Sequence, residues 1–135
     1  MAYMLSLKSF SDDRGRLIPI DRVLPFDIKR LYYIKDITDA AERGGHSHFL
    51  TIEAIFCVTG SFTVVINDGK TRQEYELNDP SHCLIVEPLD WHMIYNFSPG
   101  AVLMGVSSTH YDHSDYHYTE PVIGEPRPEE SNVKL

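Results

Sequence analysis

The chain has 135 residues, a formal net charge of −8 and 42% hydrophobic residues. This length suits one domain with one buried core and is too short for two. The acidic balance argues against a nucleic-acid partner, because binding a phosphate backbone requires a basic surface. The sequence has neither an apolar run of 18 residues nor the features of a secretory signal, so we expect a cytoplasmic protein without a membrane partner. Cys57 and Cys83 lie inside apolar runs, where we expect free buried thiols.

Short segments rich in β-branched, aromatic and aliphatic residues follow one another along the chain. They predict strands at 17–20, 30–34, 53–58, 61–67, 72–77, 82–86 and 101–107. Asn67-Asp68-Gly69 is typical of a tight hairpin, so 61–67 and 72–77 are expected to pair as antiparallel strands. Only 36–42 indicates a helical turn or two. The pattern predicts an all-β protein, either a barrel or a sandwich.

The composition changes after Tyr118. The remaining residues include three prolines and four glutamates and offer few apolar side chains to bury. We therefore predict a barrel over 1–118 and an extended or flexible C-terminal arm over 119–135.

The most informative residues are two histidines at alternate positions. His46 and His48 leave the same face of an extended strand, and a barrel makes one face its interior. Glu53 is five positions beyond His48, so it points inward only if a turn or bulge lies near 49–51. With that kink the three side chains converge, and His92 can join them from a facing strand.

The order of these residues resembles the two motifs of the cupin family. The matching positions are His46-x-His48, Glu53 and Gly60, followed by Pro88, His92 and Asn96. The second motif departs from the common pattern, because it lacks a glycine after Pro88 and has one residue fewer between Pro88 and His92. The resemblance implies a cupin double-stranded β-helix, which is a jelly-roll barrel, in a single domain.

A closer resemblance, to the sugar 3,4-ketoisomerases, covers nearly the whole chain. The matching segments are Asp13-Arg14-Gly15, Pro25-Phe26-x-Ile28-Lys29-Arg30-x-Tyr32-Tyr33-Ile34, Arg43-Gly44-x-His46-x-His48, Gly60-Ser61, Trp91-His92, and Tyr111-Asp112 through Asp115-Tyr116. That family acts on dTDP-4-keto-6-deoxyglucose in deoxysugar biosynthesis, without a metal and usually as dimers that share strands. The resemblance therefore implies a dTDP-sugar substrate, no cofactor and a homodimer. The chain departs at Phe49, where the family usually has lysine, and at Glu53, where it has glutamine.

The resemblance also implies roles for the catalytic side chains. His48 would be the base that removes the proton from C3 of the sugar, and His46 would position or stabilise the enediolate. Tyr32 and Tyr33 lie on opposite faces of their strand, so only one can enter the barrel. We favour Tyr33 as the inward residue and as the proton shuttle on the C4 oxygen.

The remaining candidate residues would bind the substrate. Arg14 and Arg43 would hold the diphosphate through forked hydrogen bonds, and Trp91 would stack on the base. His92 would line the sugar pocket, with Glu53 as a polar neighbour.

Two other functions fit the same residues. In a metal-dependent cupin, His46, His48, Glu53 and His92 would bind iron, manganese or zinc. In a non-catalytic sugar-binding cupin, the barrel would persist without turnover. Glu53, in place of the glutamine of the isomerases, is the feature that separates the metal-dependent alternative from the isomerase.

Overall fold

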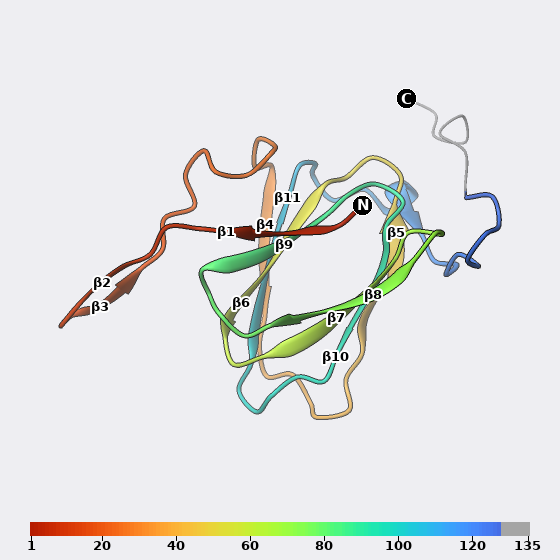
Figure 1. The fold of residues 1–135 in the computed structure, drawn as a ribbon. Coiled ribbons are helices and arrows are strands. Elements are labelled where there is room, and N and C mark those ends of the chain that lie inside the picture. Colours follow the sequence, from red (N-terminus) through yellow and green to blue (C-terminus); the bar gives the residue numbers. More distant parts are fainter. Residues whose placement is uncertain (128–135) are drawn as a thin grey trace.

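The structure is a computed structural model that describes residues 1–127. Two five-stranded antiparallel sheets face each other and form a barrel (Figure 1). The first sheet has the order β1 (Tyr3–Ser6), β9 (His82–Val86), β6 (Glu53–Thr59), β11 (Val102–Ser107) and β4 (Arg30–Ile34). The second has the order β12 (Tyr116–His117), β5 (Arg43–His48), β10 (Trp91–Tyr95), β7 (Phe62–Asn67) and β8 (Arg72–Leu77). This arrangement confirms the all-β, single-domain cupin barrel.

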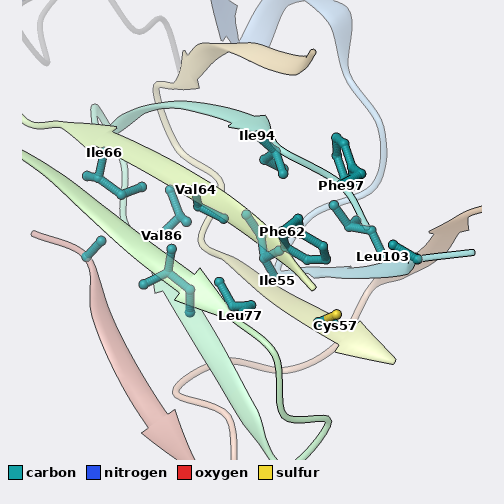
Figure 2. Packing of buried hydrophobic residues seen from close by; sticks show 13 residues of the cluster. Ile55, Cys57, Phe62, Val64, Ile66, Leu77, Val86, Ile94, Phe97 and Leu103 are labelled. Atoms are coloured by element: carbon teal, nitrogen blue, oxygen red, sulfur yellow. The ribbon is translucent and has the colours of Figure 1, made fainter. Parts of the chain in front are cut away.

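Apolar side chains at alternate positions of the strands point inward and form the core between the two sheets. Ile55 and Cys57 of β6 lie close to Phe62 and Val64 of β7, with Leu103 of β11 beside them (Figure 2). All five are fully or almost fully buried. Buried or partly buried polar residues come from β5, β6 and β10, among them His46, His48, Glu53 and His92.

A second apolar cluster lies on the opposite face of the first sheet. Phe56 and Ile85 point outward there and are covered by side chains from the connection between residues 18 and 26. The predicted strand 17–20 is displaced, since the observed strand β3 (Gly15–Leu17) ends where that prediction begins. It pairs with β2 (Phe10–Asp12) in a hairpin that projects from the barrel (Figure 1).

The predicted hairpin at Asn67-Asp68-Gly69 is confirmed. Strands β7 and β8 are antiparallel, and Gly69 has a φ of 86°, which glycine adopts without strain. Segment 36–42 forms only one turn, in which Ala41 N donates to Thr38 O at 3.0 Å. It cannot extend as a helix because Arg43 already begins the strand β5.

The first part of the predicted C-terminal arm lies against the β7–β8 turn of its own chain. Asn67 Nδ2 donates to Glu120 Oε2 and to Pro121 O, each at 2.9 Å, and Gly124 N donates to Gly69 O at 2.9 Å. The rest of the predicted arm, 128–135, lies outside the described residues, so the division of the chain at residue 118 stays a prediction. Within 1–127, no helix is long and apolar enough to cross a membrane.

Candidate active site

The glycine pair before His46 sets the register of the histidines. Gly44 and Gly45 both have positive φ, 85° and 76°, and the pairing of β5 with β10 shifts register at this point. A Cβ on Gly44 would lie 2.9 Å from His92 O, so only glycine allows the two strands to approach this closely. His46 consequently pairs with His92, and their ring centroids are 4.7 Å apart.

The turn that the sequence required before Glu53 is present. The chain leaves strand conformation at 49–52 and returns as β6, with Glu53 only 4% exposed and on the same inward face as Ile55. Glu53 Oε1 accepts a hydrogen bond from Tyr32 Oη. Its other oxygen, Oε2, lies 3.6 Å from His48 Nε2. The expected convergence of His46, His48, Glu53 and His92 is therefore observed.

The inward tyrosine is Tyr32, which corrects the prediction of Tyr33. Tyr33 is 67% exposed and points outward from β4, whereas Tyr32 packs toward the core. Gly105 on the neighbouring strand β11 pairs with Tyr32, and a Cβ there would lie less than 3.0 Å from three atoms of the phenol ring. The absent side chain at Gly105 is thus what makes room for Tyr32.

His48 is buried beside a carboxylate group. Its side chain is 4% exposed, and its Nδ1 is 3.2 Å from Asp115 Oδ2. Asp115 ends the short 3-10 helix η1 (His113–Asp115) that precedes β12. In the sequence, Asp115 is only part of a motif shared with the ketoisomerases, and no role was predicted for it.

A cavity of about 320 Å³ opens in front of these groups. Its wall includes Arg30, Tyr32, Arg43, His46, Glu53 and His92. His48 is not part of this wall. Tyr33 and Tyr116 also belong to the wall, so its polar residues are two histidines, three tyrosines, one glutamate and two arginines.

Burial favours the neutral forms of the titratable groups around the cavity. Burial and the neighbouring His92 lower the pKa of His46 to about 4 and that of His48 to about 3. Burial likewise lowers the pKa of His92 and raises that of Glu53. Burial and the neighbouring Glu53 carboxyl raise the pKa of Tyr32 well above its usual value. The imidazoles are therefore neutral at pH 7, each with a lone pair on one ring nitrogen, and Tyr32 keeps its proton.

Two of the predicted substrate-binding residues lie away from this cavity. Arg14 is on the β2–β3 hairpin, where it pairs with Asp12, and its side chain is 85% exposed. Trp91 is 4% exposed and does not belong to the cavity wall. Arg30 was not among the predicted site residues. Its guanidinium group lies over the rings of Tyr32 and Tyr111, 4.8 Å and 5.2 Å from the centroids. The only signal for it was its place in a motif shared with the ketoisomerases.

The donor set of the metal-dependent alternative is partly assembled. Among the described residues, ring nitrogens of His46, His48 and His92 lie within 4.8 Å of one another and could hold a metal ion. Glu53 is not part of this group and instead accepts from Tyr32. The three imidazoles fit a transition metal, which would act there as a Lewis acid.

Two antiparallel sheets around a histidine-lined cavity define the class of this protein as a cupin-like barrel. The family described as "FdtA: WxcM-like, C-terminal" matches residues 2–121, and the chain belongs to that family.

Named relatives of the chain are sugar isomerases. The chain is 37% identical to the TDP-4-oxo-6-deoxy-alpha-D-glucose-3,4-oxoisomerase of Aneurinibacillus thermoaerophilus. The alignment spans 115 residues, which are 84% of this chain and 83% of the relative. The structure of QdtA, a sugar 3,4-ketoisomerase from Thermoanaerobacterium thermosaccharolyticum in complex with TDP, superposes with a TM-score of 0.85. The identity is 35%, over 87% of this chain and 88% of that one. WlaRA, a TDP-fucose-3,4-ketoisomerase from Campylobacter jejuni, is 31% identical with a TM-score of 0.82, over 87% and 89% of the two chains.

Proposed function

We propose that the chain is a 3,4-ketoisomerase that acts on dTDP-4-keto-6-deoxyglucose in deoxysugar biosynthesis. The observation that carries this proposal is the cluster of neutral imidazoles beside a cavity, in a chain that matches a named 3,4-oxoisomerase over 84% of its length. The reaction moves the carbonyl from C4 to C3 through an enediol. A proton leaves C3 and another arrives at C4, so the site needs groups that accept and return protons near neutral pH.

His48 is the proposed base, and His46 stabilises the enediolate. The support for His48 is its contact with a buried carboxylate, because a carboxylate orients an imidazole and stabilises the imidazolium formed on proton transfer. His46 lies between His48 and the cavity, with the two ring centroids 4.9 Å apart. In this proposal, His48 becomes accessible to the sugar only when the His46 ring moves. Substrate-free sites commonly tighten into their reactive geometry only with substrate bound.

Tyr32 takes the role first assigned to Tyr33, the movement of the proton on the C4 oxygen. Its hydroxyl lies in the cavity wall and donates to Glu53, so it has a partner on the protein side during proton transfer. His92 lines the sugar pocket. These roles require that the sugar ring enters the cavity with its C3–C4 edge toward the histidines.

The diphosphate is proposed to lie against Arg43, with Arg30 beside it. Both guanidinium groups are in the cavity wall, and arginine forks onto phosphate oxygens. Binding energy from the nucleotide would then orient the sugar at the histidines.

Arg14 contributes through a homodimer in this proposal. The β2–β3 hairpin carries Arg14 away from its own barrel, and every residue of the two strands is exposed (Figure 1). An exposed projecting hairpin suits exchange between two copies of the chain, which covers its unpaired edges. Light scattering during size-exclusion chromatography should give twice the chain mass, and a monomer at micromolar concentration would contradict the dimer.

The enzyme is proposed to work in the cytoplasm. Its two cysteines, Cys57 and Cys83, are free and buried, as is usual in a reducing compartment.

Exchange of the sugar C3 proton with deuterated solvent tests the function and the base together. The wild-type protein should exchange this proton and form the 3-keto product. His48→Asn should abolish exchange while the affinity for TDP stays nearly unchanged, because the base acts in the transition state. If His48→Asn still exchanges and His46→Asn does not, the two roles are reversed. Absence of exchange in the wild type refutes the ketoisomerase.

Calorimetry with TDP tests the nucleotide subsite separately. Arg43→Ala should weaken TDP binding by at least about tenfold, equivalent to ~1.4 kcal/mol. Lys70→Ala is the matched control, because Lys70 is an exposed cation of the β7–β8 turn and is not part of the cavity wall. Equal losses in the two variants would assign the effect to overall charge.

The metal-dependent cupin is the second candidate, supported by the spacing of the three histidine nitrogens. Metal analysis of the purified protein before and after chelation separates the two functions. We expect substoichiometric metal and an isomerase activity that survives the chelator. A stoichiometric transition metal whose removal abolishes activity would replace the first proposal with the second.

A further inference from the structure

Asp115 is a buried carboxylate surrounded by hydrogen-bond donors. Its side chain is 8% exposed. Oδ1 accepts from Leu50 N at 2.7 Å, and Oδ2 accepts from Thr51 N at 3.3 Å and from Thr51 Oγ1. Backbone N–H groups can only donate, so both oxygens of Asp115 are acceptors. His48 Nδ1 is the remaining polar neighbour, 3.2 Å from Oδ2.

This environment determines which ring nitrogen of His48 carries the hydrogen. Nδ1 faces an acceptor, so it is the nitrogen that donates. A neutral imidazole has only one N–H, which leaves the lone pair on Nε2. Nε2 is buried and has no hydrogen-bond partner among residues 1–127, with Glu53 Oε2 3.6 Å away. The free lone pair thus lies on the Glu53 side of the ring, away from Asp115.

The same residue holds the turn that brings Glu53 into the barrel. Its backbone carbonyl accepts from Phe49 N at 3.0 Å, while its side chain accepts from the next two backbone N–H groups, those of Leu50 and Thr51. These contacts fix three consecutive residues between His48 and Glu53. One side chain therefore connects the orientation of the histidine with the position of the glutamate.

We propose that Asp115 is a positioning residue that fixes His48 in the Nδ1–H tautomer and so makes Nε2 the proton acceptor of the site. The inference rests on the proposed function, because it assigns how the base of that reaction is held ready. A carboxylate with a purely structural role would brace the 49–51 turn without affecting the tautomer.

Asp115→Asn separates these two roles with little change in shape. An asparagine has one acceptor oxygen and one donor NH₂ group, so it cannot accept on both sides. With its oxygen toward Leu50 N, the NH₂ group faces His48 Nδ1 and drives the hydrogen to Nε2, which removes the lone pair needed for catalysis. We expect kcat to fall by roughly 10²–10⁴-fold, the range seen when a partner that orients a catalytic imidazole is lost. KM and TDP affinity should change little.

Asp112→Asn is the matched control. Asp112 caps the same helix η1, accepting from Ser114 N at 3.0 Å, but it is exposed and does not contact His48. It should keep kcat within about twofold, because surface substitutions usually have small effects. A loss in Asp112→Asn as large as in Asp115→Asn would assign the effect to the loop and overturn the proposal.

Nitrogen-15 NMR of the imidazole rings reads the tautomer directly and needs no activity. The wild-type spectrum, assigned with His48→Asn, should show hydrogen on Nδ1 of His48, and Asp115→Asn should move it to Nε2. Hydrogen on Nε2 in the wild type would overturn the proposal even if Asp115→Asn failed to fold. Wild-type protein without ketoisomerase activity would refute the proposed function, whereas the spectrum would still decide the role of Asp115.

Discussion

Gly105→Ala perturbs the Tyr32–Glu53 hydrogen bond without altering either residue. The added Cβ would lie less than 3.0 Å from ring atoms of Tyr32, including its hydroxyl oxygen. Non-bonded carbon atoms pack at ~3.5–4.0 Å, so the ring must move by about 1–2 Å, and the hydrogen bond of its hydroxyl group to Glu53 then loses its geometry. Overpacking costs ~1–3 kcal/mol and an unsatisfied buried polar group another ~1–3 kcal/mol. We expect the free energy of unfolding to fall by roughly 2–6 kcal/mol.

Tyr32→Phe isolates the hydroxyl from the ring. If Tyr32 moves the proton, this variant should lower kcat by about 10²-fold. Gly105→Ala should lower it comparably. The double variant should be no worse than the poorer single variant, because both changes remove the same contact. Urea unfolding and steady-state kinetics supply the measurements. An unchanged unfolding midpoint in Gly105→Ala, or kcat losses that multiply in the double variant, would refute this reasoning.

Two further changes test the electrostatics and the register of the site. Burial raises the pKa of Glu53, so between its unfolded and folded pKa values the folded state holds more protons, and stability falls as pH rises through that window. The lowered pKa values of His46, His48 and His92 act in the opposite direction, so the contribution of Glu53 is the difference in slope between the wild type and Glu53→Gln in urea unfolding. Glu53→Gln should make stability rise more steeply, or fall less steeply, with pH across the window and keep activity within about tenfold, ~1.4 kcal/mol of barrier; identical slopes in the two proteins would contradict the contribution of Glu53. Gly44→Ala should destabilise the protein by about 1–3 kcal/mol more than Gly100→Ala. Both glycines have positive φ, but only a Cβ on Gly44 meets the His92 carbonyl, so equal unfolding free energies would contradict the register argument.

The shared orientation of His46 and His48 and the turn before Glu53 were predictable, because alternate residues of a strand point to the same face. A spacing of two keeps His46 and His48 on one face, and a spacing of five forces a turn before Glu53 can join them. The choice between Tyr32 and Tyr33 was not local. Parity allows either to point inward, and the residue that decides it, Gly105, lies on a different strand.

The spacing of nearby residues could not predict that Asp115 is the partner of His48 either. Asp115 is 67 residues away along the chain and meets His48 only after the last described strand pairs with β5.

The predictions for Arg43 and Arg14 had different outcomes for a related reason. Arg43 belongs to β5, the strand that carries His46 and His48, and is part of the cavity wall. Arg14 lies on the β2–β3 hairpin, and no sequence pattern specified the direction of that hairpin.

The departure at Glu53 fits a site whose histidines and carboxyl group are shifted toward their neutral forms before reaction. Burial lowers the pKa of the histidines and raises that of Glu53, beside the guanidinium groups of Arg30 and Arg43. A neutral Glu53 carboxyl has one acceptor and one hydroxyl donor, much as a glutamine amide has one acceptor and one donor group. Proton transfer to His48 would then create an imidazolium and an enediolate together in a region of low dielectric, where Asp115 stabilises the cation from behind. Around His48, charge would therefore increase toward the state that the reaction must reach, and the Asp115 carboxylate that stabilises the imidazolium is already in place.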